Sequence, residues 1–209
     1  MGLPINKLIC ASNINKVLTD FFNTGLYDRK REFLKTISPS MDILISSNLE
    51  RLLYFKSKDE NKVKQYMEDL KTKGEFKSDE SYDEFYADYA SDAEALDAIK
   101  EEFNSSSYFL DPHTAVAKKV YDKYVKDTLD NTPTVILSTA SPYKFIKSIS
   151  SALDLDSNLD EFELIDMVSK KSNTLIPNVI TEIRKNIRSN HPKTLDEAHK
   201  YLEENLLRK

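Results

Sequence analysis

The chain has 209 residues, of which 40% are hydrophobic and 31% are charged, and its formal net charge is −5. This is the balance of a soluble folded protein rather than a disordered one, and the acidic charge argues against a nucleic-acid-binding surface, which is usually basic. Nowhere do about 18 apolar residues follow one another, so the sequence predicts no transmembrane helix.

Cysteine and glycine usage narrows the possibilities further. Cys10 is the only cysteine, so no internal disulfide can form, which fits a cytoplasmic location. The three histidines and this cysteine have no metal-ligand spacing, and no metal site is expected. Gly2, Gly25 and Gly74 are the only glycines, so this chain contains no glycine-rich phosphate-binding loop.

The N-terminal part reads as a strand followed by a helix. Residues 6–12 form an apolar run typical of a buried strand, and Ser12 and Asn13 are suited to cap a helix over residues 14–24. Gly25 stands where a helix ends with a left-handed residue. This unit is typical of α/β sheets.

A turn over residues 37–45 precedes a helix that Ser46 and Ser47 are suited to cap. Residues 57–105 then carry 15 acidic and 7 basic residues. Apolar residues at helical spacing, Phe85 and Tyr89 among them, predict two or three short helices that form an inserted acidic subdomain. The simplest interpretation of its charge is a solvated face, and the alternative is a binding surface.

The C-terminal half contains one clear strand signal among helices. Residues 134–139 are β-branched and apolar, as buried parallel strands are. The helices are expected to begin at Asp111-Pro112 and at Ser141-Pro142, and to span residues 161–170 and 194–207, the last with Thr194 and Glu197 as a capping box.

Two strong strands cannot make a complete doubly wound sheet. We therefore expect an α/β fragment whose neighbouring strands come from elsewhere. The predicted organisation is a larger unit over residues 1–56 and 106–209, interrupted by the helical insertion at 57–105.

Two sites carry candidate functional side chains. Ser138 and Thr139 end the predicted strand just before a helix N-terminus, where ligands bind in open α/β sheets; the alternative is an ordinary turn with capping hydroxyls. His113 lies in the first turn of the helix after Asp111, where a neutral imidazole could donate a hydrogen bond to a substrate; the alternative is a packed histidine.

Three groups of segments, in this order along the chain, resemble the threonine synthases of the fungal and bacterial long-chain type. They are residues 8–15 with Thr24-Gly25, residues 37–43 with 47–51, and residues 111–117 with 138–145. The resemblance implies the C-terminal part of a fold-type-II (tryptophan-synthase-beta-like) lyase that depends on pyridoxal 5′-phosphate. Members of the family convert O-phospho-L-homoserine and water to L-threonine and phosphate.

The resemblance also implies what this chain lacks. The family's Schiff-base lysine and the loop that holds the cofactor phosphate are expected upstream of residue 1, so no catalytic residue is assigned here. The isolated chain is expected to be inactive, to bind no pyridoxal phosphate or only weakly, and to require the N-terminal half of the enzyme as its partner.

The resemblance carries over specific residues. Thr139 is expected to hydrogen-bond the pyridine nitrogen of the cofactor, with Ser138 beside it. Many relatives have histidine where this chain has Ser141, so no role is carried over for that imidazole. The residues expected to border the cleft, some of them in contact with the phosphohomoserine carboxylate or phosphate, are Asn13, Asn15, Ser40, Asp42, His113 and Thr114.

Two alternatives remain at this point. One is a non-catalytic helical module that binds a protein partner through the acidic segment. The other is a different fold-type-II enzyme, which is disfavoured because residues 38–42 and 111–115 are threonine-synthase-like.

Overall fold

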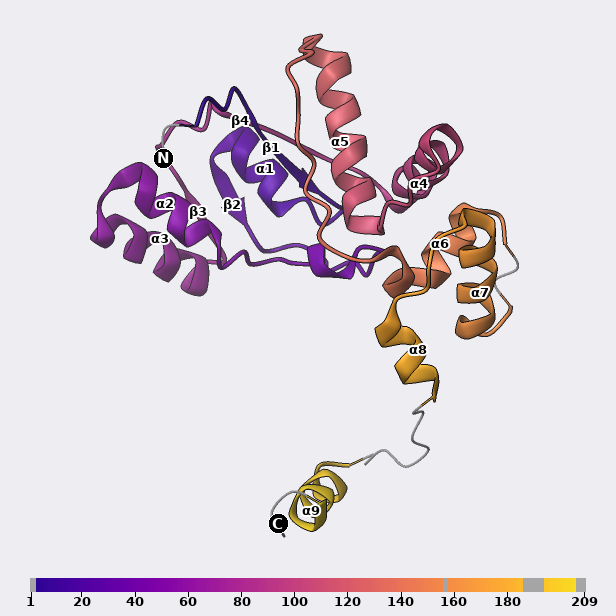
Figure 1. Ribbon diagram of the computed structural model, residues 1–209. Coiled ribbons are helices and arrows are strands. Elements are labelled where there is room, and N and C mark those ends of the chain that lie inside the picture. The colour runs from indigo at the N-terminus through magenta and orange to yellow at the C-terminus, as the bar shows by residue number, and fades with distance from the viewer. Residues whose placement is uncertain (1–2, 156–157, 186–193, 206–209) are drawn as a thin grey trace. The chain divides into compact units, whose positions relative to one another are not determined.

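The computed structural model describes residues 3–155, 158–185 and 194–205, in two units that divide after Asn173 (Figure 1). The first unit contains β1 (Leu8–Ser12), α1 (Val17–Thr24), β2 (Leu26–Asp28), the 3-10 turn η1 (Pro39–Met41), α2 (Leu49–Ser57), α3 (Glu60–Thr72), β3 (Glu75–Lys77), β4 (Phe85–Tyr89), α4 (Asp92–Ser106), α5 (Pro112–Thr128), the 3-10 turn η2 (Pro142–Phe145), α6 (Ile146–Ala152) and α7 (Glu161–Ser172). The second unit contains α8 (Asn178–Lys185) and α9 (Leu195–Asn205). In the described part of the chain, no helix is both long and apolar enough to cross a membrane.

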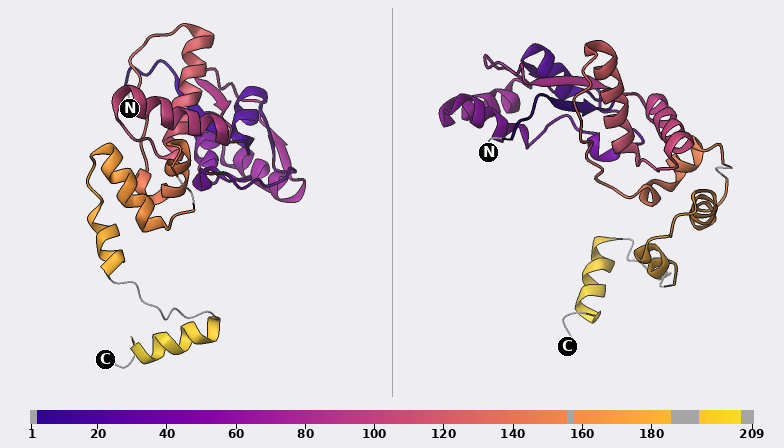
Figure 2. Two further views of the ribbon diagram at one scale, coloured as in Figure 1. Left: turned by 90° about the vertical axis from the view of Figure 1, so that its right-hand side faces the viewer. Right: turned by 45° about the horizontal axis from the view of Figure 1, so that its top comes forward.

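A parallel pair of strands lies at the centre of the first unit. β1 pairs with β4 in the register Leu8 to Phe85 through Ser12 to Tyr89. Both α1 and α5 pack against this pair, and α5 lies between the strands and α4 (Figures 1 and 2). A second, antiparallel pair joins β2 to β3.

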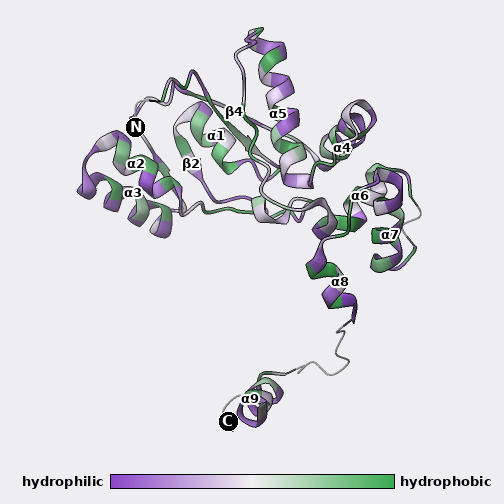
Figure 3. Cartoon of the chain, viewed as in Figure 1, coloured by the Kyte–Doolittle hydropathy of each residue, from purple (hydrophilic) through white to green (hydrophobic). Residues whose placement is uncertain are grey.

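The core beside β2 and β3 is rich in aromatic rings. Phe21 is fully buried, and its ring centroid lies 5.0 Å from that of Tyr82 and 5.8 Å from that of Phe76. The ring of Phe76 stacks on Tyr27 and Tyr66, with centroids 5.4 Å and 4.9 Å away. Hydrophobic and hydrophilic residues alternate around α2, α3 and α5, so each helix has an apolar face for packing (Figure 3).

Three predictions that depend on neighbouring residues are confirmed. Gly25 ends α1 in the left-handed conformation with φ 71°, and an added Cβ there would lie 3.1 Å from the carbonyl oxygen of Ser78. Asp111 caps α5 by accepting a hydrogen bond from the backbone N–H of His113. Thr194 and Glu197 form the predicted capping box of α9.

Two predicted N-caps are wrong. α1 begins at Val17 rather than at residue 14, and Asn13 does not cap it because its side chain is bonded elsewhere. Ser46 and Ser47 do not cap α2, which follows Asn48 without any side-chain cap.

The predicted helix around Phe85 and Tyr89 is also wrong, because these residues form β4. Residues four apart share a face both in a helix and in a strand, so the spacing alone did not distinguish the two. Segment 57–105 is therefore not helical throughout, and its strand β4 pairs with β1. Its boundaries as an insertion stay a prediction.

The predicted strand over residues 134–139 is absent. The segment joins no strand in the described part of the chain, and Val135 and Leu137 are 84% and 75% exposed. A parallel strand obtains its hydrogen bonds from neighbouring strands, and no described segment supplies them.

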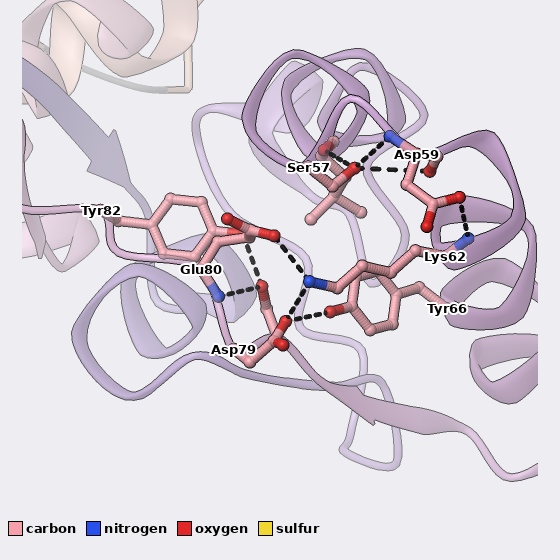
Figure 4. Close-up of polar contacts among 9 residues, drawn as sticks. Ser57, Asp59, Lys62, Tyr66, Asp79, Glu80 and Tyr82 are labelled. Atoms are coloured by element: carbon pink, nitrogen blue, oxygen red, sulfur yellow. Dashed lines mark hydrogen bonds and ion pairs between the residues drawn. The ribbon is translucent and has the colours of Figure 1, made fainter.

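An ion-pair cluster fastens α3 to the connection between β3 and β4 (Figure 4). Lys62 Nζ lies 2.6 Å from Asp79 Oδ1 and 2.7 Å from Glu80 Oε1, and the Tyr66 hydroxyl donates to Asp79 Oδ1 over 2.7 Å. The hydrogen bond from Lys62, followed by that from Tyr66, lowers the pKa of the Asp79 carboxyl to about 2.

The aromatic core predicts a large difference between two phenylalanines. Phe21→Ala removes a fully buried ring and should lower the free energy of unfolding by about 3–5 kcal/mol. Phe55 is 63% exposed, and Phe55→Ala should cost less than about 1 kcal/mol. Urea denaturation measures both values, and equal losses would contradict this description of the core.

The ion-pair cluster predicts a specific pH effect. Lys62→Met should raise the pKa of Asp79 from about 2 toward the ordinary value of about 3.9, as read by NMR titration of the carboxyl carbon. Because a lowered folded-state pKa stabilises the fold above the unfolded pKa, stability is lost as the pH falls from about 4 toward 2. That loss should shrink in the variant. Lys64→Met, which removes a lysine with no ion pair in the described residues, should leave the Asp79 titration unchanged.

Candidate functional site

Two buried asparagines follow the carboxyl end of β1. Asn13 and Asn15 lie in the turn between β1 and α1. Asn13 Oδ1 accepts hydrogen bonds from the backbone N–H and the side-chain amide of Asn15, over 3.0 Å and 3.1 Å. The side-chain amide of Asn15 also makes two hydrogen bonds with the backbone of Leu34. Its Oδ1 accepts from Leu34 N–H over 3.0 Å, and its Nδ2 donates to Leu34 O over 2.9 Å.

Asp42 gathers these side chains around one carboxylate. Its Oδ1 accepts hydrogen bonds from Asn13 Nδ2 over 2.7 Å and from Asn15 Nδ2 over 3.1 Å. Thr36 donates its hydroxyl to Oδ1 over 2.7 Å and its backbone N–H to Oδ2 over 3.0 Å. Ser38 is buried beside them and lies within hydrogen-bonding distance of both Asn13 and Thr36. These five residues, here called the asparagine cluster, hold the loop of residues 34–42 against the end of β1.

A second buried group lies at the start of α5. Asp111 is fully buried, and His113 and Thr114 are buried beside it. Asp111 Oδ1 accepts from the backbone N–H of His113 over 3.0 Å and lies 2.9 Å from His113 Nδ1. The Thr114 hydroxyl donates to Asp111 Oδ2.

His113 connects this group to the other two segments. Its Nε2 accepts a hydrogen bond from the backbone N–H of Ser40 over 3.1 Å. The ring of Phe145, at the end of η2, meets the imidazole edge to face with centroids 4.9 Å apart. Residues from the three family-like groups of segments therefore meet, with the asparagine cluster reaching His113 through the loop that contains Ser40.

Three of the predicted site residues have available hydroxyl groups. Ser40, Ser138 and Thr139 are exposed, and no hydrogen bond within the described residues uses their hydroxyls. A free hydroxyl can donate one hydrogen bond and accept two, so each can bind an anion or a ring nitrogen. Thr139 does not lie on a strand, and its contact with a pyridine nitrogen stays a prediction.

The six residues predicted to border the substrate differ in availability. The buried amides of Asn13 and Asn15 and the carboxylate of Asp42 are bonded to one another, the imidazole of His113 is bonded to backbone and to Asp111, and the hydroxyl of Thr114 is bonded to Asp111. Ser40 alone among the six is exposed. Whether any of them contacts substrate stays a prediction.

Sequence reasoning missed Thr36, Ser38 and the central position of Asp111. Asp111 was predicted as a helix cap, and the confirmed cap uses one carboxylate oxygen only. A further signal was present in the sequence, because His113 and Thr114 follow the cap within one turn and carry the donors that both oxygens bind.

A separate hollow of about 610 Å³ lies between α2 and α3. Apolar and charged side chains line it, including Tyr54, Phe55, Met67, Lys64 and Glu68. None of the predicted site residues is among those that line it.

Comparison with known proteins shows which family the chain resembles. Residues 114–187 match the family model for the threonine synthase C-terminal region. Threonine synthase-like 1 of Homo sapiens is 46% identical over 162 residues, which cover 74% of this chain and 21% of that protein. The chain thus spans about a fifth of the length of this relative.

Two solved structures have the same fold over most of the chain. The crystal structure of threonine synthase from yeast matches with a TM-score of 0.75 and 33% identity, over 88% of this chain and 38% of that one. The structure of threonine synthase with bound pyridoxal phosphate from Brucella melitensis matches with a TM-score of 0.66 and 38% identity, over 73% of this chain and 33% of that one.

These matches show that the fold is that of part of a pyridoxal-phosphate enzyme of fold type II. The chain is similar to the C-terminal region of the threonine synthases, over most of its own length and over less than half of theirs.

The asparagine cluster predicts that Asp42 is important for stability. Asp42→Ala leaves the amides of Asn13 and Asn15 without their shared acceptor and should lower the free energy of unfolding by about 2–4 kcal/mol. Asp122 forms an ion pair with Lys118 one turn away on the surface of α5, so Asp122→Ala should change it by about 0.5 kcal/mol or less. Chemical denaturation compares the two, and similar small losses would show that the cluster contributes little.

Proposed function

We propose that this chain forms the C-terminal part of a threonine synthase that, when complete, converts O-phospho-L-homoserine and water to L-threonine and phosphate. The observation that supports this most is the contact of His113 with both Ser40 and Phe145, which brings three family-like segments to one place, where the hydroxyl of Ser40 is free. A reducing cytoplasm is the compartment we propose, since Cys10 is the only cysteine.

Thr139 is proposed to donate its hydroxyl to the pyridine nitrogen of the cofactor, with Ser138 next to it. Pyridoxal phosphate, when bound, supplies a ring that accepts electrons from the substrate carbon. A neutral hydroxyl at the ring nitrogen leaves that nitrogen largely unprotonated, whereas a carboxylate would keep a proton on it. The hydroxyl therefore moderates electron withdrawal by the ring.

On the substrate side, we propose that Ser40 binds an anionic group of phosphohomoserine. Ser40 is the exposed member of the predicted set, and its backbone is held by His113. The roles that we propose for Asn13, Asn15, Asp42, His113 and Thr114 are to hold this loop in shape and to exclude water from its base.

The isolated chain is proposed to lack activity and to bind pyridoxal phosphate weakly or not at all. It has three glycines and therefore no glycine-rich loop for the cofactor phosphate. The exposed segment 134–139 has the sequence of a buried strand without a partner. The partner we propose is the N-terminal part of a threonine synthase, which would supply both features.

The hollow between α2 and α3 favours a second candidate. Its exposed Tyr54 and Phe55 could receive a protein segment, which would make the chain a non-catalytic binding module. A binding module of this kind would neither need to associate with an N-terminal part nor form threonine or phosphate.

Complementation tests the proposed function. The chain, mixed with a separately produced N-terminal part of the yeast enzyme and pyridoxal phosphate, should form phosphate and L-threonine in equal amounts, while either part alone forms neither. Thr139→Ala should lower the rate about tenfold or more, the value of one lost hydrogen bond in the transition state. Thr72→Ala, which removes an exposed hydroxyl bonded only within α3, should have no effect.

The outcomes separate the candidates. Phosphate without threonine would reject the proposed product, and a compact monomer that ignores the N-terminal part would favour the binding module. A lysine of the isolated chain that is labelled specifically by pyridoxal phosphate and borohydride, as mass spectrometry would show, would refute the proposed inactivity of the chain alone.

A further inference from the structure

The carboxylate of Asp111 makes more hydrogen bonds than a helix cap requires. An ionised carboxylate that is fully buried is costly unless hydrogen bonds satisfy its oxygens. A cap uses one oxygen and one backbone N–H, and Asp111 Oδ1 meets that requirement at His113 N. The remaining bonds go to the side chains of His113 and Thr114, so the arrangement of these side chains depends on Asp111.

The hydrogen bonds of His113 define one tautomer. A neutral imidazole carries one ring proton, and the proton that faces Asp111 Oδ1 lies on His113 Nδ1 because the other nitrogen is an acceptor. The N–H of Ser40 can only donate, so His113 Nε2 carries a lone pair and no proton. Nδ1 is therefore the donor and Nε2 the acceptor. The hydrogen bond of Nδ1 to Asp111 favours the tautomer in which Nε2 is free to accept.

Ser40 is held from outside its own loop by this bond. Within η1, the backbone N–H groups of Met41 and Asp42 donate to Ser38 O and Pro39 O, whereas the N–H of Ser40 donates to His113. The asparagine cluster fixes the loop at Ser38 and Asp42, on either side of Ser40. His113 therefore restrains the middle of a loop whose two ends are already fixed.

We propose that Asp111 is a positioning residue: through the tautomer of His113 it fixes the backbone of Ser40 and so presents the Ser40 hydroxyl to an anionic group of the substrate. The substrate part of this inference rests on the proposed function. The relay from Asp111 to His113 to Ser40 rests on the hydrogen bonds and can be tested without any reaction.

Two substitutions of His113 divide the relay into its halves. In His113→Gln, the amide oxygen can reach the position of Nε2 and accept from Ser40, while the donor to Asp111 is lost. In His113→Asn, the shorter amide can take the place of Nδ1 and donate to Asp111, while the acceptor for Ser40 is lost. If His113 only filled space, His113→Gln should disturb the structure at least as much as His113→Asn.

NMR on the ¹⁵N-labelled full chain is the direct experiment. The imidazole of His113 should show a proton on Nδ1 and none on Nε2, with a coupling across the N–H···N bond to the Ser40 amide. Hydrogen exchange at Ser40 should accelerate about tenfold or more in His113→Asn and stay within about threefold of the original in His113→Gln. A proton on Nε2, or equal exchange in the two variants, would overturn the relay.

Asp111 itself has a matched control in the same chain. Asp111→Ala should mix the two tautomers of His113 and accelerate exchange at Ser40 by about the same factor as His113→Asn. Asp160 caps α7 through a capping box, and Asp160→Ala should leave both signals of His113 and Ser40 unchanged. If Asp111→Ala does not fold, Asp111→Asn, which keeps an oxygen for Nδ1–H, should retain the tautomer, and loss of the tautomer there would count against hydrogen bonding as the cause.

The complemented enzyme separates this inference from the proposed function. His113→Asn should raise KM for O-phospho-L-homoserine about tenfold with a smaller change in kcat, and His113→Gln should restore most of the affinity. Unchanged KM together with the predicted NMR results would overturn the substrate part and leave the relay standing. Absence of any product from the complemented chain would instead reject the proposed function, while the NMR results would still decide the relay.

Discussion

The parallel pairing of β1 with β4 is the contact on which the rest of the first unit depends. It joins residues 8–12 to residues 85–89, so two segments more than seventy residues apart in the sequence have their carboxyl ends at the same edge of the strand pair. Asn13 and Asn15 follow the first strand at that edge, and α4 follows the second after a short turn. Because α5 packs on both strands, its N-terminal residues Asp111 and His113 come within reach of the loop that contains Ser40.

A two-strand parallel pair is nevertheless an incomplete sheet. Parallel sheets are normally covered on both faces and extended by further strands, and a pair has two edges with unpaired backbone groups. The segment 134–139 has the composition of such a further strand, and its apolar side chains are exposed. The same deficiency thus accounts for the failed strand prediction and for the proposal that another segment of a threonine synthase completes the sheet.

Several features that are decided by residues close together in the chain were predicted well from the sequence, although the caps expected at Ser46 and Ser47 were not. The cap at Asp111, the left-handed Gly25 and the capping box at Thr194 are all settled within one helical turn. Prediction failed where residues distant in the sequence determine the structure. One example is β4, whose residues form a strand by pairing with β1. Asn13 shows the same limit in the site: a cap was expected, but its amide is bound by Asp42, 29 residues away. The resemblance selected segments whose residues contact one another in the structure, and it could not show that most of the selected side chains are bonded internally.

That mutual bonding determines what kind of recognition these residues can provide. The charged groups in the two clusters, Asp42 and Asp111, are both acidic and are occupied by internal donors. The groups left free are the neutral hydroxyls of Ser40, Ser138 and Thr139. Neutral hydroxyls orient an anion but contribute little Coulombic attraction, and strong phosphate binding generally uses cations or a row of backbone N–H groups. These residues therefore supply orientation rather than Coulombic attraction for a phosphate, which is consistent with the proposal that this chain forms only one side of the site.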